Sequence, residues 1–201
     1  MALNFANNNS LSAITTKPSG LSGGSMNLIS TQTASSSSTI SFTSGIDSTY
    51  DEYVFKFYNI HPATDQANFT FQADTGTNTS YNQTMTTTYF VAYHNESDSD
   101  ANLVYASGRD QAQGTGFQQI TRESGNANDE CFSGTLKVFN PSSTTFVKHF
   151  ICETAASQFE NYIDDTFIAG YFNTTTALTR FQFKFSSGNI DSGVIKLYGV
   201  S

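Results

Sequence analysis

The sequence predicts an all-β protein, an antiparallel β-sandwich of jelly-roll type with about 8–10 strands and an extended N-terminal arm. Two features of composition favour this class. Charged residues make up only 13% of the 201 residues, against a usual share of about 25%, and Ser, Thr and Asn take their place. The chain also has 18 Phe and 10 Tyr but no Trp. Phe, Tyr, Thr and Val are strand-forming residues, and no stretch has helical spacing.

Candidate strands recur about every ten residues from residue 39 onward, with turn-forming clusters between them. They are expected at residues 39–43, 53–60, 68–72, 86–94, 116–123, 132–140, 145–153, 167–172, 178–186 and 194–200. Phe181, Phe183 and Phe185 alternate with polar residues, so they are expected to share one face of their strand. The last strand is expected to lie between two neighbours, because the final strand of an antiparallel sandwich can be a central one.

Residues 1–38 carry a single charge, Lys17, and are rich in Ser, Thr and Gly. We expect them to form a docking arm in front of a sandwich that covers residues 39–201, although residues 26–33 already have strand character. The arm would order against a partner through its apolar residues. The expected anchors are Leu3, Phe5, Leu11 and Ile14. A solvated tail is the alternative.

The relative position of the two cysteines is predicted from a hairpin between the strands 132–140 and 145–153. Pro141 and Ser142 suit the centre of a type I turn. Pairing about that centre places Cys131 directly opposite Cys152. In a reducing compartment both thiols would stay free. The alternative is that they are two small buried side chains whose matching positions are a coincidence.

The sequence contains no catalytic signature, so we expect a protein that is not an enzyme and needs no cofactor. The three histidines are His61, His94 and His149. His61 precedes a proline and is expected in a turn, and His149 is expected on the surface of a strand. Motifs for nucleophilic hydrolysis, for a zinc helix and for phosphate binding are all missing from the sequence.

Two acidic clusters are candidates for a cation site or a catalytic site. Glu96, Asp98 and Asp100 occupy alternate positions, which could gather oxygen ligands around Ca²⁺. The glycine and terminal glutamate of an EF-hand loop are missing, so a solvated loop is favoured and no metal ligand is assigned. Asp164 and Asp165 form a second, weaker candidate.

Charge and hydropathy narrow the range of partners. The net charge is −8, and the sequence isoelectric point is about 4.6. A surface of this sign repels phosphate backbones, so nucleic acid is not an expected partner. No run approaches the roughly 18 apolar residues of a membrane span, and no secretory signal precedes the first strand. We therefore expect synthesis in a cytoplasm and no membrane span.

Several stretches together resemble one known family. They lie at residues 42–65, 71–84, 90–96, 134–150 and 169–200. The chain resembles small jelly-roll-like virion structural proteins of tailed bacteriophages, especially phages of marine bacteria and cyanobacteria. The resemblance covers about residues 26–201. The length of the match is specific, but the family carries no catalytic motif that could be matched.

The resemblance implies a non-enzymatic structural protein on the virion surface, made in the host cytoplasm. It would act as a head decoration (cement) protein or as a fibre-type protein, docked on capsid or tail proteins through the arm. Symmetric assembly as a homotrimer is expected. The alternative is a carbohydrate-binding receptor-recognition module of a tail fibre, which would bind a host surface glycan. Tyr50, Tyr81 and Tyr105 would then be the candidates for stacking on sugar rings.

Overall fold

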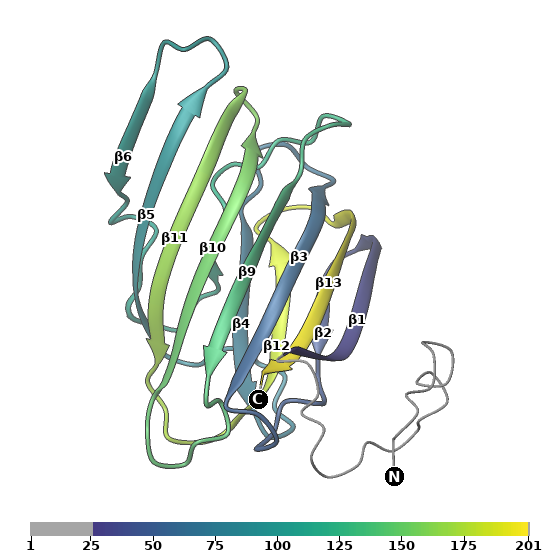
Figure 1. The fold of residues 1–201 in the computed structure, drawn as a ribbon, viewed down its shortest axis with the longest axis vertical. Helices are drawn as coiled ribbons and strands as arrows, with labels where there is room; N and C mark the ends of the chain where they lie inside the picture. The colour runs from purple at the N-terminus through teal and green to yellow at the C-terminus, as the bar shows by residue number, and fades with distance from the viewer. Residues whose placement is uncertain (1–25, 201) are drawn as a thin grey trace, which may run out of the picture.

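The computed structural model describes residues 26–200, which form two antiparallel sheets packed face to face (Figure 1). The predicted all-β antiparallel sandwich is confirmed. The strands are β1 (Met26–Ser37), β2 (Ile40–Phe42), β3 (Glu52–Pro62), β4 (Phe69–Thr75), β5 (Met85–Asn95), β6 (Ala101–Tyr105), β7 (Ala112–Gly114), β8 (Gln118–Gln119), β9 (Phe132–Phe139), β10 (Lys148–Gln158), β11 (Tyr162–Phe172), β12 (Leu178–Phe185) and β13 (Ile190–Val200).

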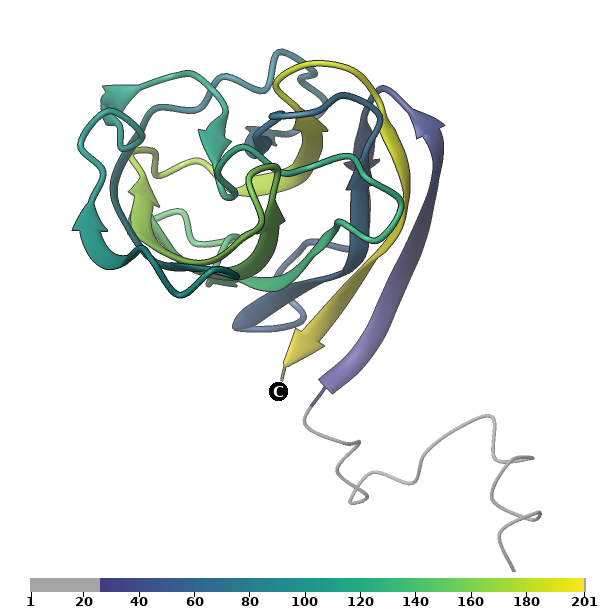
Figure 2. The ribbon, with the colours of Figure 1, turned by 90° about the horizontal axis from the view of Figure 1, so that it is seen from above.

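The two sheets differ in size. The larger sheet has nine strands in the order β1-β13-β3-β9-β10-β11-β5-β6, with β7 paired to β5. The smaller sheet has four strands in the order β2-β12-β4-β8. Seen from above, the larger sheet curves around the core and the smaller sheet (Figure 2). This unequal division differs from two equal four-stranded sheets, and the jelly-roll type remains a prediction.

The larger sheet begins at residue 26, inside the segment 1–38 that was assigned to the arm. β1 pairs with β13 along most of its length, and Ala34 is buried against the core. The candidate strand 26–33 is therefore a real strand, and it is longer than expected. The expected anchors Leu3, Phe5, Leu11 and Ile14 lie outside the described residues.

The final strand, β13, lies between β1 and β3, as expected for a strand held on both sides. Its inward residues Ile195 and Leu197 are completely buried.

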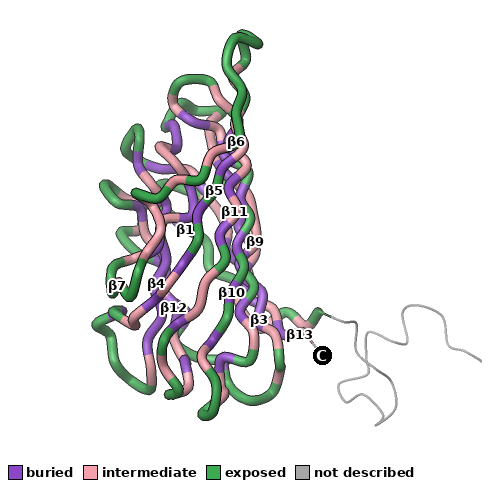
Figure 3. Tube along the Cα trace, turned by 90° about the vertical axis from the view of Figure 1, so that its left-hand side faces the viewer, coloured by how far each residue is buried: buried purple, intermediate pink, exposed green. Residues whose placement is uncertain are grey.

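Phenylalanine dominates the core between the sheets. Phe181 and Phe183 are fully buried and Phe185 almost fully, so the predicted shared face of β12 is confirmed. The Phe55 and Phe183 rings lie 5.1 Å apart, and the Phe69 and Phe132 rings 4.8 Å apart, in tilted or edge-on arrangements. Edge-on aromatic pairs are more stable than stacked sandwiches. Figure 3 shows the buried residues gathered where the two sheets face each other, while the β5–β6 end is exposed.

The predicted cross-strand cysteine pair is wrong. Cys152 lies opposite Leu136 in the β9–β10 ladder. The carbonyl of Cys131 instead accepts a hydrogen bond from the Ser157 amide at 3.1 Å. Both cysteines are free thiols.

The reason for the error lies in the length of the β9–β10 loop. The predicted turn does form, since the Ser143 amide bonds to the Asn140 carbonyl at 3.1 Å. The strands do not start to pair there, however. The Ser143 hydroxyl accepts bonds from the amides of Thr145 and Phe146, which adds a second bend before β10 begins at Lys148. The extra residues shift the register and move Cys152 past Cys131.

The free cysteines are expected to differ in reactivity. Cys152 is fully buried, and burial raises the pKa of its thiol. Burial also raises the pKa of the Cys131 thiol, but Cys131 is only partly buried and can be reached by a reagent. Because the thiolate is the reactive form, native protein should take up one equivalent of iodoacetamide, on Cys131, and a second only after unfolding. Peptide mass spectrometry measures this. Labelling of Cys152 at the rate of Cys131 in native protein would contradict the burial described above.

Candidate functional site

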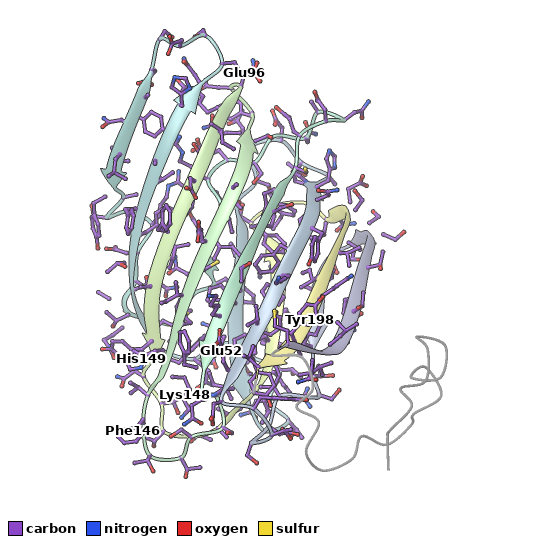
Figure 4. All side chains as sticks on the ribbon, viewed as in Figure 1. Glu52, Glu96, Phe146, Lys148, His149 and Tyr198 are labelled. Carbon is purple, nitrogen blue, oxygen red and sulfur yellow. The ribbon has the colours of Figure 1, made fainter. Side chains whose placement is uncertain are left out.

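The most distinctive surface of the molecule is the outer face of the larger sheet, the face that points away from the smaller sheet. It consists of alternate side chains of β1, β13, β3, β9, β10, β11, β5 and β6. No described element of residues 26–200 packs over it, and the curvature of the sheet makes it convex (Figure 2). Figure 4 looks onto this face, where Glu52, His149 and Tyr198 are labelled.

Exposed apolar side chains are concentrated on this outer face. Among the described residues, every large apolar side chain that is strongly exposed lies on it, except Phe146 in the β9–β10 loop. These residues are Met26, Leu28, Tyr58, Phe90, Leu103, Tyr105, Ile151 and Ile163. Single exposed apolar residues are normal, so an interaction surface is indicated where several of them are neighbours on adjacent strands.

The apolar residues are densest at the β5–β6 edge, where Phe90, Phe167, Leu103 and Tyr105 form what we call the aromatic patch. The rings of Phe90 and Phe167 lie opposite each other on neighbouring strands and are stacked, with centroids 5.1 Å apart. Tyr105 lies opposite Phe90 on β6. Leu103 and Tyr105 are 65% and 58% exposed. The patch therefore presents two protruding apolar side chains on the paired strands β5 and β6.

The tyrosine hydroxyl of this patch is held by an acidic neighbour. Tyr105 Oη donates a hydrogen bond to Asp110 Oδ2 at 2.5 Å. This bond raises the pKa of Tyr105, because the neutral phenol is the donor. Tyr105 is the one tyrosine of the three expected for sugar stacking that is strongly exposed. Tyr81 is buried, and Tyr50 packs against Tyr53.

Like charges lie side by side on the central strands of the outer face. Lys56 of β3 and Lys196 of β13 are directly opposite each other. Their ammonium groups lie over the rings of Tyr198 and Tyr58, at 5.9 and 5.4 Å from the ring centroids. Directly opposed like charges destabilise a sheet, so this arrangement favours an external acidic partner.

An acidic hollow lies beside these lysines. It has a volume of about 370 Å³ and is formed where small residues of β9 and β10 leave room between Glu153 and Asp165. Burial, and then the nearby Glu153 carboxylate, raise the pKa of Asp165. Near the middle of the outer face, the Lys56 and Lys196 side chains therefore lie on one side of β9 and the Glu153 and Asp165 carboxylates on the other.

The two residues of the weaker acidic candidate, Asp164 and Asp165, point to opposite faces of β11. Asp164 points inward, is fully buried and forms a bidentate ion pair with Arg122, with both N–O distances 2.8 Å. The Arg122 guanidinium also lies 4.8 Å from the centre of the Tyr93 ring. Asp165 points outward. The sequence contained no signal that Arg122, in a loop, would be the partner.

The alternating cluster of Glu96, Asp98 and Asp100 does not converge on one point. Asp98 pairs with His94 at 3.1 Å, and Asp100 accepts a hydrogen bond from Tyr162 at 3.1 Å. Within residues 26–200, no group of three or more acidic, histidine or cysteine side chains is placed to hold a metal ion.

A polar cavity of about 380 Å³ opens at the end of the β10–β11 hairpin. Its walls include Glu96, Asp129 and Glu130. Glu130 already accepts the Ala127 amide at 2.6 Å. Gln158 also lines the cavity, and its Oε1 is buried without a hydrogen-bond partner among the described residues.

The three histidines lie in different surroundings. His61 Nε2 bonds to the Ala127 carbonyl at 3.1 Å and its Nδ1 lies 3.6 Å from Asp191. It sits within β3 rather than in the expected turn. His149 is on the outer face of β10, as expected, against Tyr171.

Comparison with known proteins adds no family to these observations. No protein-family model, no curated protein and no solved structure matches the chain. Among the described residues, no helix has the length and hydropathy needed to cross a bilayer. The class that the fold and the surface define is an antiparallel β-sandwich whose larger sheet has an outer face, uncovered by the described residues, that carries both apolar and charged side chains.

Proposed function

We propose that the chain is a non-enzymatic structural protein of a tailed-phage virion, a head decoration or fibre-type protein as the sequence resemblance implies. The observation that carries this proposal is the concentration of exposed apolar side chains on the outer face of the larger sheet. A rigid sheet that exposes aromatic residues on one side is suited to permanent packing against another protein.

The binding partner that best fits the aromatic patch is an apolar surface of a neighbouring protein of the virion. The patch combines two rings stacked 5.1 Å apart with the protruding side chains of Leu103 and Tyr105. Its charged neighbours, Asp110 and Asp165, lie at the rim rather than in the centre. An apolar centre with a polar rim is the usual anatomy of a protein interface. Docking through Leu3, Phe5, Leu11 and Ile14 remains a further part of this proposal.

The test is incorporation into particles. Chains that carry Leu103→Asp should fold normally but be depleted at least about tenfold from gradient-purified particles, because a charge in the centre of an apolar contact is strongly unfavourable. Quantitative mass spectrometry of the chain relative to the major coat protein measures this. Phe146→Asp is the matched control, since Phe146 is 70% exposed but lies off the face. It should be incorporated like the wild type.

Two results would contradict the proposal. One is that the wild-type chain is missing from purified particles. The other is that both aspartate variants are incorporated equally well. If the chain is missing from particles and binds a glycan array through Tyr105, the carbohydrate-binding alternative replaces the structural role. Loss of glycan binding in Tyr105→Ala would identify that site.

A further inference from the structure

The three central strands β3, β9 and β10 align their outward side chains in levels across the sheet. Within each level, a β3 residue and a β10 residue flank one residue of β9. The levels are Lys56–Thr135–Glu153, Val54–Lys137–Ile151 and Glu52–Phe139–His149. The outward side chains of β3 and β10 are therefore related to each other across β9, one pair at each level.

Each of the two outer levels pairs a carboxylate with a side chain that can donate to it, a lysine at one level and a histidine at the other. Lys56 faces Glu153 across β9 at one level. Glu52 and His149 face each other across β9 at another, and Figure 4 shows both at the same height on the sheet. Because β9 lies between them, the members of each pair are two strands apart, about 10 Å in the plane of a sheet. Neither pair forms an ion pair within residues 26–200.

The middle level is complementary in shape. Ile151 of β10 protrudes and is 50% exposed. Val54 of β3 is only 4% exposed, since it lies between taller side chains such as Tyr198. A protruding apolar residue on one side of β9 thus corresponds to a recessed apolar residue on the other side.

From this pattern we infer that a second copy of the chain docks on the outer face, related to the first by a two-fold axis that runs along β9. Rotation about that axis keeps each level in place and exchanges the two sides, so β3 of one copy lies over β10 of the other. Lys56 then meets the partner's Glu153, Glu52 meets the partner's His149, and Ile151 enters the recess over Val54. A two-fold interface requires this self-complementarity of one face.

One end of the proposed interface, along β9, leaves room for close approach. Ser133 and Thr135 of β9 are small and line the acidic hollow of about 370 Å³, which leaves room for side chains of the partner. Packed sheets lie about 10 Å apart, and the convex curvature limits the contact to β9 and the strands beside it. The aromatic patch at the β5–β6 edge stays outside this contact and remains available to the particle partner. The inference therefore concerns the isolated chain and does not depend on the proposed place in a virion.

The first measurement is the molar mass of the full-length chain by light scattering after size exclusion, at low salt. The expected mass is twice the 21.9 kDa of one chain. Dissociation should increase at about 1 M salt, where charges are screened beyond roughly 3 Å. A monomer at all concentrations, or the trimer expected from the resemblance, would overturn the two-fold arrangement.

Charge reversal tests the predicted contact between Lys56 and Glu153. Lys56→Glu alone and Glu153→Lys alone each place like charges together twice per dimer. Each should weaken the dimer at least about tenfold, because opposed like charges at an interface cost several kcal/mol. An equal mixture of the two variant chains should restore the dimer, since in the mixed dimer both contacts again join opposite charges. Native mass spectrometry distinguishes the mixed dimer from either homodimer.

Two further variants separate this contact from a general effect of charge. Lys184→Glu reverses a charge on the smaller sheet, where Lys184 lies over the Phe117 ring, and should leave the mass unchanged. Lys137→Ser should tighten the dimer, because the two copies of Lys137 come close together at the axis. Failure of the mixed chains to associate, or dissociation by Lys184→Glu, would overturn the inference.

Discussion

Replacing Phe183 with alanine is expected to destabilise the protein by about 4 kcal/mol, the middle of the range for a buried phenylalanine. Phe183 is fully buried at the centre of the aromatic core. Its ring lies within 6.4 Å of the rings of Phe42, Phe55, Phe57, Phe69 and Phe71. These rings come from both sheets, so the cavity left by the change cannot close by moving one strand.

The measurement for Phe183→Ala is denaturant unfolding, with thermal unfolding as a second readout. A loss of this size should lower the melting temperature by about 10 °C in a domain of this length. Phe146→Ala removes the same atoms from a side chain that is 70% exposed, and it should change stability by less than about 0.5 kcal/mol. Equal effects of the two substitutions would show that the core described above is wrong.

Asp164→Ala is expected to destabilise the protein by about 3 kcal/mol, because it leaves the Arg122 guanidinium without its carboxylate. Both N–O distances of the pair are 2.8 Å and the Asp164 side chain is fully buried. The pair joins the loop before β9 to β11, so its loss also loosens that end of the sandwich. Urea unfolding measures the change.

The neighbouring aspartate provides the matched control for this prediction. Asp165→Ala removes the same group one residue later, on the outer face, where burial and Glu153 already disfavour its charge. Its effect should be within about 0.5 kcal/mol. The double change Arg122→Met with Asp164→Leu should recover much of the stability, since an apolar pair has no buried charge to leave unpaired. A larger loss for Asp165→Ala than for Asp164→Ala would contradict the assigned orientations.

Most strands could be predicted because a half-buried strand must alternate apolar and polar side chains. β12 shows this in Phe181, Phe183 and Phe185, all of which face the core. The strands that were missed lie at the edges of the larger sheet. β6 follows a turn-forming cluster and pairs only with β5, so little of it is buried and its pattern is weak. β7 also pairs only with β5, and its three residues are too few to show an alternating pattern.

The register of the β9–β10 hairpin could not be predicted from the local sequence. The turn at Pro141 was recognised from its residues, and it forms. The length of the loop after it depends on bonds from Ser143 and on contacts to other segments, such as the bond from the Leu178 amide to the Pro141 carbonyl at 2.9 Å. Contacts between residues distant in the chain have no local pattern, and a shift in register was enough to separate Cys131 from Cys152.

The candidate interaction surface depends on the same kind of contact. Lys56, Glu153 and Phe90 are far apart in the chain and come together on one face only through the strand order of the larger sheet. In the same way, two adjacent aspartates receive opposite environments because β11 points one toward Arg122 and the other outward.

Composition and the two-residue period of a strand are enough to predict the class of fold, the acidic charge and the Phe residues that fill the core. Which strands are neighbours and which charges meet depends instead on contacts between distant parts of the chain. The same contacts leave exposed apolar side chains on the outer face of the larger sheet, because two packed sheets bury only the faces that they share.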